Sequence, residues 1–334
     1  MFEVNLTLGE EEEYMKLGFL DTWLYTTLII YHMLITLSAL IGNPVILYGS
    51  FKYNAINVEE TSVMFIKCLA VTDILILMSS AIPILTTLLA KRWVLGRVVC
   101  FFHAYFIFVP GISQNLIILM ISCYKLRYIT KPFSVPPSGK ATRNWMIAVY
   151  MFAVLYSLVA IPLADGAEFS LPDLSCIPKF ENLRIKIYSS LGILLLNFVP
   201  SVTMFIVNIL ILLQAHAASK KHGDRLSLKS LVFISTIAWI YMISSIPKGV
   251  RYVLQALGRE PSMWLGVFQK EVYFLNISSN WIVYTITNRD FRRFLKRLAS
   301  LKLKDHAIRV GSKASPNSVV LTNTIVADPS TTVL

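Results

Sequence analysis

One carboxyl group stands apart in this chain because it lies inside a long apolar stretch. Asp73 ends the segment Leu69-Ala70-Val71-Thr72-Asp73. A charged carboxylate at the centre of a bilayer costs roughly 2.5–3.5 kcal/mol on insertion scales. Such a residue persists where it faces the interior of a helix bundle and takes part in ion, proton or ligand chemistry. The sequence offers only Asp73 as an intramembrane carboxylate of this kind.

Three cations form a second candidate set. Lys248 and Arg251 are spaced i, i+3 in one apolar stretch, so they share one face of a helix, and Lys270 lies in the next stretch. Cations one to two turns inside a membrane indicate an anionic ligand group: a carboxylate, a phosphate or the acidic side chains of a peptide. Two alternatives stay open, because the side chains could snorkel toward headgroups or pair with Glu271 or Glu260.

Catalytic and metal-binding signatures are absent from the sequence. The histidines form no His-x-x-x-His pair, and no glycine-rich phosphate loop is present. The cysteines fit no zinc spacing; they are Cys68, Cys100, Cys123 and Cys176. We therefore expect a protein that is not an enzyme and that carries no cofactor, apart from the sodium ion considered below.

The elements that must position these residues are seven long apolar stretches. Hydrophobic residues make up 55% of the 334 residues and charged residues 15%, whereas soluble domains average about 25% charged residues. This composition indicates lipid as the surrounding solvent. The expected fold is an all-α membrane protein, a seven-transmembrane helix bundle. Its predicted helices span residues 23–50, 61–90, 97–129, 145–163, 186–214, 228–257 and 263–287.

The chain therefore divides into four expected segments. They are an extracellular N-terminus (1–22), the transmembrane domain (23–287), an interfacial helix (288–300) and a disordered cytoplasmic tail (301–334). The interfacial helix is predicted because apolar residues repeat at i, i+3, i+4 and i+7 opposite a cationic face. These residues are Phe291, Phe294, Leu295 and Leu298. A surface helix of a soluble protein shows the same pattern, but the position directly after a membrane span favours the interfacial interpretation.

Charge distribution predicts the orientation of the chain. The net charge is +12, and most lysines and arginines fall on the cytoplasmic side if the N-terminus is outside. We therefore expect a multi-pass plasma membrane protein with an extracellular N-terminus and a cytoplasmic C-terminus. The inner cations would attract anionic lipid rather than nucleic acid. Asn5-Leu6-Thr7 is a glycosylation sequon on the predicted outer side.

Two cysteines lie on the outer side in this topology. Cys100 is at the outer start of the third helix, and Cys176 follows the fourth. Because that side is oxidising, a disulfide between them is expected, the alternative being two free thiols.

Short motifs occur in a characteristic order along the helices. They are Gly42-Asn43, Leu69-Ala70-Val71-Thr72-Asp73, Trp93-Val94-Leu95-Gly96 followed by Cys100, Pro200, Pro247, Asn276, and Asn280-Trp281-Ile282-Val283-Tyr284. Together they resemble the rhodopsin-like (class A) G-protein-coupled receptor family over about residues 40–300. The resemblance implies a receptor that couples binding of a ligand to a G protein.

The chain departs from the family pattern at the positions that act as switches. Tyr124-Lys125-Leu126 replaces Asp-Arg-Tyr, and lysine lacks the planar five-donor fork of arginine. Ser244-Ser245-Ile246-Pro247 replaces Cys-Trp-x-Pro. Asn208 stands in place of a tyrosine, and Trp281 in place of the proline of the last helix. These changes leave activation and G-protein coupling open.

The resemblance also implies a sodium site, which is present in part. Asp73, Asn276 and Asn280 match the family, and Tyr284 completes the polar switch, whereas Gln114 stands where a small hydroxyl residue is usual. One interpretation is a hydrated pocket that holds sodium. The other is a polar cluster that only packs the second, third and seventh helices.

The family's ligand pocket lies among the third, fifth, sixth and seventh helices. Ile107 stands where amine receptors carry aspartate, and Phe274 where opsins carry the retinal lysine. The resemblance therefore implies neither an amine nor a retinal Schiff base. His103 would join Ile107 and the three cations, Lys248, Arg251 and Lys270, in this pocket.

The expected partners follow from the same resemblance. Tyr124, Lys125, Leu126 and Arg127 would face a heterotrimeric G protein, and a phosphorylated tail would recruit arrestin. Thr332-Val333-Leu334 resembles a ligand for a PDZ domain. The leading hypothesis is a cell-surface receptor for a peptide or an anionic small molecule. Its alternatives are a ligand-binding receptor-like protein with weak or arrestin-biased signalling and a transporter or channel, although no internal repeat supports the latter.

Overall fold

A backbone that crosses hydrocarbon must satisfy its own N–H and C=O groups, so each long apolar stretch forms a helix. The computed structural model describes residues 22–52, 60–131, 137–163, 165–170, 173–179, 181–222, 225–257, 259, 262–289 and 291–300. It separates into two units, Met1–Phe291 and Arg292–Leu334. The expected sequon at Asn5, the tail 301–334 and its terminal Thr332-Val333-Leu334 lie outside the described residues.

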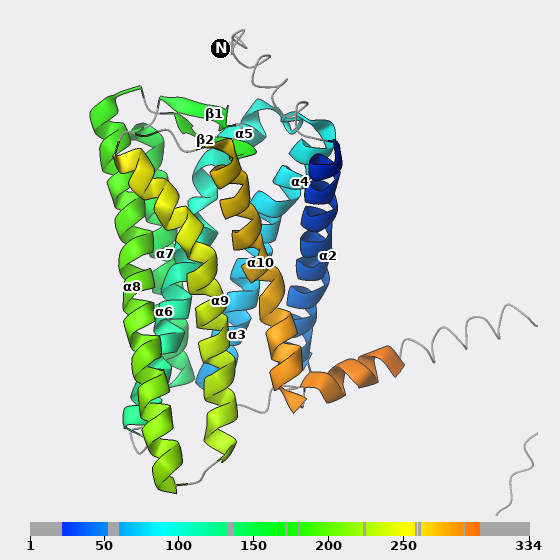
Figure 1. The fold of residues 1–334 in the computed structure, drawn as a ribbon, viewed down its shortest axis with the longest axis vertical. Coiled ribbons are helices and arrows are strands. Elements are labelled where there is room, and N and C mark those ends of the chain that lie inside the picture. Colours follow the sequence, from blue (N-terminus) through cyan, green and yellow to red (C-terminus); the bar gives the residue numbers. More distant parts are fainter. Residues whose placement is uncertain are drawn as a thin grey trace, which may run out of the picture. The chain divides into compact units, whose positions relative to one another are not determined.

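The described part of the first unit forms seven helical rods (Figure 1). In chain order they are α2 (Thr22–Lys52); α3 (Glu60–Ile76) with η1 (Leu77–Ala81) and α4 (Ile82–Ala90); α5 (Gly96–Phe106) with α6 (Phe108–Thr130); α7 (Gly139–Leu163); α8 (Leu183–His222); α9 (Arg225–Ala256); and α10 (Met263–Thr287). Each predicted helix is present. The largest differences are the earlier start of α7 and the later end of α8.

Two of the rods depart from regular α-helical hydrogen bonding just before a proline. The π-helical turn η1 ends at Ala81, two residues before Pro83, and the α5–α6 break at Ile107 lies three residues before Pro110. Proline has no N–H to donate and its ring crowds the preceding turn, so the backbone there must adjust its hydrogen bonding. Pro44, Pro200 and Pro247 lie inside continuous helices.

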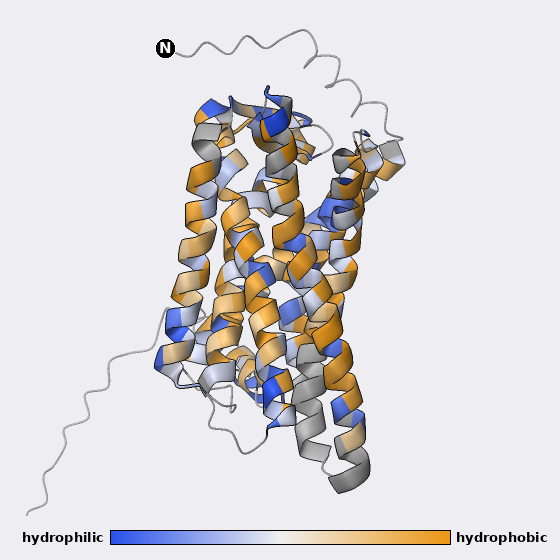
Figure 2. Ribbon diagram, turned by 90° about the vertical axis from the view of Figure 1, so that its left-hand side faces the viewer, coloured by the Kyte–Doolittle hydropathy of each residue, from blue (hydrophilic) through white to orange (hydrophobic). Residues whose placement is uncertain are grey.

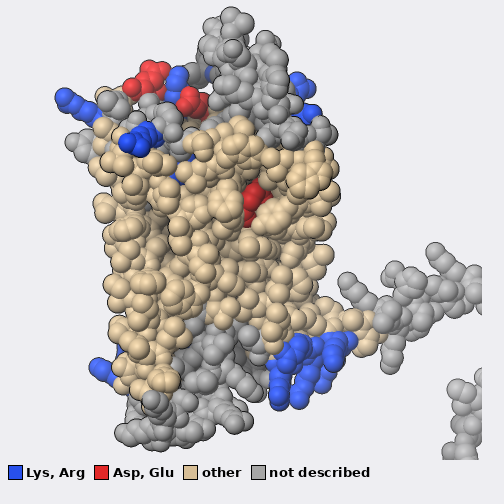
Figure 3. Space-filling model, in the orientation of Figure 1, with Lys and Arg blue, Asp and Glu red and all other residues tan. Residues whose placement is uncertain are grey.

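The rods pack around α6, which contacts α3, α7, α8 and α9, while α2 contacts α3 and α10. Hydrophobic residues make up most of the length of the rods (Figure 2), and many of their large apolar side chains are exposed. Leu34 is 62% exposed and Leu213 is 61% exposed. Between the two ends of the bundle, the face seen in Figure 3 carries almost no charged residues. Among the described residues, five helical segments are long and apolar enough to span a membrane, and α9 and α10 are also long enough to do so.

A β-hairpin lies across one end of the bundle, called here the hairpin end (Figure 1). Strands β1 (Gly166–Ser170) and β2 (Ser175–Lys179) are antiparallel, with Phe169 opposite Cys176. A disulfide joins Cys176 to Cys100 of α5, which confirms the predicted pairing. The Tyr105 hydroxyl donates to the Gly166 carbonyl at 2.7 Å. The hairpin is therefore fixed along α5. The sequence had predicted only a loop here.

Residues 291–300 are helical, as the amphipathic pattern predicts, and all of them except Phe291 belong to the second unit. Their location in a membrane interface stays a prediction.

Candidate functional site

The three predicted cations come together beneath the hairpin. Arg251 of α9 donates from Nη1 to Asp173 Oδ1 and from Nη2 to Asp173 Oδ2, both at 2.6 Å. Lys270 Nζ of α10 lies 3.7 Å from Asp173 Oδ1 and donates to Ser175 Oγ at 3.1 Å. Asp173 and Ser175 belong to the hairpin, so Arg251 contacts it through a bidentate ion pair and Lys270 through a hydroxyl and a longer contact with the same carboxylate.

The surroundings of Asp173 favour its charged form. Ser170 Oγ donates to Asp173 Oδ2 at 2.7 Å, and the residue is 7% exposed. Burial by itself raises the pKa of Asp173, but the charge of Lys270 and the hydrogen bonds from Arg251 outweigh it and hold the pKa below its usual value. The stability that this carboxylate contributes is therefore present above its unfolded pKa and is lost as the pH falls through the lower folded value.

The third cation, Lys248, has a different environment. Its Nζ donates to Asn197 Oδ1 of α8 at 2.8 Å and lies 5.5 Å from the centre of the Tyr273 ring. Asn115 Nδ2 donates to the same Asn197 oxygen, also at 2.8 Å. Among the described residues, no ion pair is formed by Lys248. Its ammonium group is directed into the bundle, so it does not snorkel toward headgroups.

Two further residues predicted for this pocket contact its edges. His103 Nδ1 donates to the Cys176 carbonyl at 3.1 Å, and its ring packs edge-on against Trp93. His103 therefore supports β2 rather than contacting a cation. Ile107 is half-buried at the junction of α5 and α6. Of the predicted pairing partners, Glu271 forms its ion pair elsewhere, and Glu260 lies outside the described residues.

Glu271 and His32 form a buried pair that sequence reasoning missed. His32 Nδ1 lies 2.8 Å from Glu271 Oε1 and 3.1 Å from Oε2, and His32 Nε2 donates to the Ala81 carbonyl at 2.9 Å. The His32 ring also meets Phe274 edge-on at 5.3 Å. The pair links α2, η1 and α10. The sequence signal that could have identified the pair was a glutamate inside the apolar stretch 263–287. Glu271 is buried, so Asp73 is not the only buried acid among the described residues.

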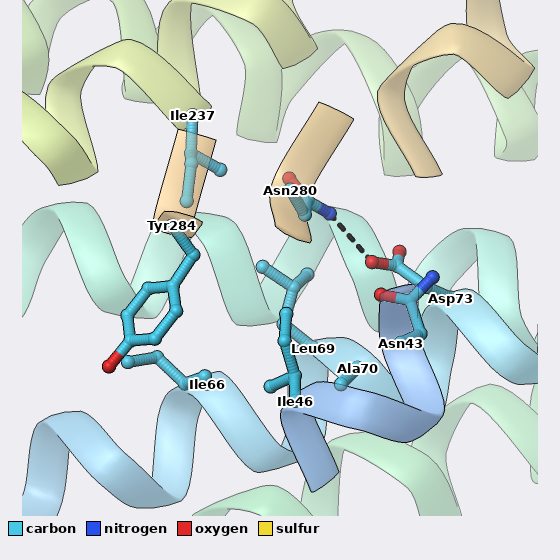
Figure 4. Close-up of a pocket in the computed structure, with 9 residues that line it drawn as sticks. All are labelled: Asn43, Ile46, Ile66, Leu69, Ala70, Asp73, Ile237, Asn280 and Tyr284. Carbon is cyan, nitrogen blue, oxygen red and sulfur yellow. Dashed lines mark hydrogen bonds between the residues drawn. The ribbon is translucent and has the colours of Figure 1, made fainter. Parts of the chain in front are cut away.

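Asp73 is the centre of a polar cluster in the middle of the bundle. Gln114 Nε2 donates to Asp73 Oδ1 at 2.8 Å, and Asn280 Nδ2 donates to Oδ2 at 2.7 Å (Figure 4). The cluster borders a cavity of about 20 Å³, which Asn43 and Tyr284 also line. That volume is enough for about one water molecule.

The same cluster presents oxygens that have no hydrogen-bond partner among the described residues. They are Asn43 Oδ1, Gln114 Oε1, Asn276 Oδ1 and Asn280 Oδ1. Hard cations are bound by carboxylate and amide oxygens. Asp73, Gln114, Asn276 and Asn280 therefore fit the chemistry of a sodium site, and Gln114 contributes an oxygen as well as a donor. Tyr284 lies further along the cavity and accepts from Asn288 Nδ2 at 3.0 Å.

The predicted G-protein-facing residues lie at the end of α6 opposite the hairpin. Lys125 is buried, and its Nζ donates to Ser62 Oγ of α3 at 3.2 Å. Tyr124 is buried against Phe65, Leu126 is half-buried, and Arg127 is exposed. The lysine that stands in place of the family's arginine is therefore bonded to a neutral hydroxyl on the neighbouring helix.

Trp281, which stands in place of a proline, packs against α2. Its Nε1 donates to Ser38 Oγ at 2.9 Å, and its ring occupies the space that a side chain at position 42 would need, which Gly42 leaves empty. Asn43 Nδ2 donates to the Ile277 carbonyl at 3.1 Å, which joins the same two helices. Asn208, which replaces a tyrosine, donates to Ser122 Oγ of α6 at 3.2 Å. Lys125, Asn208 and Trp281, three residues that depart from the family pattern, thus each form a hydrogen bond between helices.

Comparison with known proteins agrees with this architecture. The family described as 7 transmembrane receptor (rhodopsin family) matches residues 42–286. Squid rhodopsin superposes with a TM-score of 0.70 at 18% identity, covering 85% of this chain and 87% of that one. Mouse melanopsin is 27% identical over 128 residues, which are 38% of this chain and 24% of that protein. Human melanopsin is also 27% identical over 128 residues, 38% of this chain and 26% of that protein.

The chain thus spans about a quarter of the length of these melanopsins, whereas the match to the receptor family extends from the first helix to the last. Members of that family are multi-pass membrane receptors rather than enzymes. The chain belongs to the rhodopsin family of seven-transmembrane receptors.

Proposed function

We propose that this receptor binds an extracellular ligand that carries an anionic group and signals through a heterotrimeric G protein. The observation that carries this proposal is the excess of positive charge beneath the hairpin. Arg251 and Lys270 share one described acid, Asp173, as an ion-pair partner, and Lys248 forms no ion pair among the described residues. Buried charges need compensation, so a ligand anion would stabilise the pocket. The hairpin end is then extracellular, which agrees with the distribution of lysine and arginine.

The same excess of positive charge argues against an amine ligand. A cationic amine would be repelled by three positive side chains at the hairpin end, and it would need a receptor carboxylate that is available to pair with it. Asp173 is already bonded to Arg251 through both oxygens. An acidic small molecule or a peptide with acidic side chains avoids that repulsion.

The test is a screen of small organic acids and acidic peptides on cells that express the full chain. Calcium, cyclic-nucleotide and arrestin-recruitment readouts are recorded in parallel. We expect Lys248→Ala combined with Lys270→Ala to abolish the response to an acidic agonist, because truncating buried charge partners typically costs about 2–5 kcal/mol of binding energy. The exposed Lys179→Ala serves as the control at equal surface expression. Full potency in the double variant would refute the proposal.

A second candidate function is a receptor with weak G-protein coupling that signals mainly through arrestin. The bond from Lys125 to Ser62 favours it, because the family's arginine at this position is replaced by a cation already engaged within the bundle. The arrestin readout of the same screen separates the two candidates. Two further partners are proposed. They are a PDZ-domain protein that binds Thr332-Val333-Leu334 and anionic lipid that binds the lysines and arginines of the cytoplasmic side.

We also propose that the Asp73 cluster holds a sodium ion. The ion would supply a positive charge beside the Asp73 carboxylate, and the unpartnered oxygens of Asn43 and Asn280, which line the cavity together with Asp73, support this proposal. We expect the thermal unfolding midpoint of the purified receptor to be higher in sodium chloride than in choline chloride, and Asp73→Asn to abolish that difference. Asp165→Asn, an exposed acid of the hairpin end, is the control. An unchanged sodium response in Asp73→Asn would leave only the packing role.

A further inference from the structure

We infer that the three cations beneath the hairpin have two separate tasks. Arg251 holds the β1–β2 hairpin over the bundle through Asp173, and Lys248 with Lys270 receives a carboxylate of the ligand. The second half of this inference rests on the proposed function, whereas the first half does not.

The bond between Arg251 and Asp173 has the geometry of a fixed structural contact. The guanidinium meets both carboxylate oxygens at 2.6 Å, and Arg251 and Asp173 are each 7% exposed. Ser170 occupies a further acceptor site of the carboxylate. Because this pair is bidentate and buried, and because its carboxylate is also bonded to Ser170, it fixes the orientation of the two side chains as well as the distance between them. Arg251 is therefore committed to the hairpin and is not available to a ligand.

The position of Asp173 explains why this contact would control the hairpin. The disulfide at Cys176 fixes β2 to α5 on one side of the pocket. Asp173 lies three residues before Cys176, in the turn between the strands, and fixes the hairpin to α9 on the other side. The disulfide and the Tyr105 bond hold the hairpin to α5, and the bond from Lys270 to Ser175 holds it to α10. The ion pair is therefore what joins the hairpin to α9.

Lys248 and Lys270 are in a different position. Lys248 is bonded to an amide oxygen that already accepts from Asn115, and Lys270 is bonded to a hydroxyl, with Asp173 at 3.7 Å. Tyr273, three residues after Lys270 on α10, presents its ring to Lys248. The helices that carry the two ammonium groups, α9 and α10, pack against each other. A carboxylate between the two groups would provide both with a charged acceptor.

Hydrogen–deuterium exchange on the purified full-length receptor, without ligand, tests the first task. We expect Asp173→Asn and Arg251→Gln each to increase amide exchange across residues 166–179 by more than tenfold. The double variant should exchange no faster than Asp173→Asn alone, because that variant already removes the carboxylate to which Arg251 is bonded. Arg251→Lys keeps the charge but loses the bidentate fork, so it should give intermediate protection.

The matched control is Lys248→Gln, which should leave the exchange of the hairpin unchanged. Wild-type protection in Asp173→Asn, or equal opening in Lys248→Gln, would overturn the assignment of Arg251 to the hairpin.

Thermal unfolding with carboxylate probes tests the second task. Sodium benzoate represents a free organic acid, and N-acetyl-aspartyl amide represents an acidic peptide side chain, each compared with sodium chloride at equal ionic strength. We expect at least one probe to raise the midpoint of the wild-type receptor, and Lys248→Gln and Lys270→Gln to lose at least tenfold in apparent affinity for it.

The two tests fail in different ways. If neither probe stabilises the wild-type receptor while the exchange result holds, the carboxylate assignment and the proposed ligand class are both wrong, and the hairpin contact stands. If the probes bind but Arg251→Gln loses as much affinity as Lys248→Gln with the hairpin still protected, the division of tasks is wrong and the proposed function stands.

Discussion

Replacing Gly42 with alanine will destabilise the bundle by about 3 kcal/mol or more. A Cβ atom at this position would lie 2.0 Å from Trp281 Cγ and 2.1 Å from its Cδ1. These are rigid ring atoms close to the α10 backbone, and the indole is also held by its bond to Ser38. The ring therefore cannot move aside without breaking that bond or separating α2 from α10.

Thermal unfolding of the purified receptor measures this effect. Gly111→Ala is the matched control, because a Cβ there meets no heavy atom within 4 Å, and alanine in a helix is favoured over glycine by up to about 1 kcal/mol. In a Trp281→Ala background the same Gly42→Ala change should cost little, because the atoms that clash are absent. Equal midpoints for Gly42→Ala and Gly111→Ala would show that the helices separate without cost.

The second large effect is expected at the buried pair of His32 and Glu271. His32→Phe keeps the ring that packs against Phe274 but leaves the Glu271 carboxylate buried without its partner. Breaking a buried pair in this way costs roughly 3–5 kcal/mol. The double variant His32→Phe/Glu271→Leu removes the remaining buried charge, so it should recover most of the stability.

The same unfolding measurement tests this prediction. His216→Phe, at an exposed histidine of α8, controls for the substitution itself and should change the midpoint little. If His32→Phe unfolds at the wild-type temperature, or if the double variant is less stable than the single one, the pair does not connect α2 to α10 as described.

The sequence by itself determined the helices and their order. An apolar stretch of about 20 residues has one stable structure in hydrocarbon, because only a helix satisfies its backbone within a single segment. The pairing of Cys100 with Cys176 also followed from topology, since both cysteines lie on the same oxidising side. Asp73 was identified because a carboxylate in a membrane span is rare enough to be informative alone.

Only the tertiary structure decided which side chains meet. His32 and Glu271 are 239 residues apart, and Arg251 and Asp173 are 78 apart. Helices that are apolar on most faces carry little periodic signal for their rotation, so the sequence does not show which face of α2 meets α10. The contact between Gly42 and Trp281, the bond of Lys125 to Ser62 and the bond of Arg251 to Asp173 all depend on that rotation and on helix register.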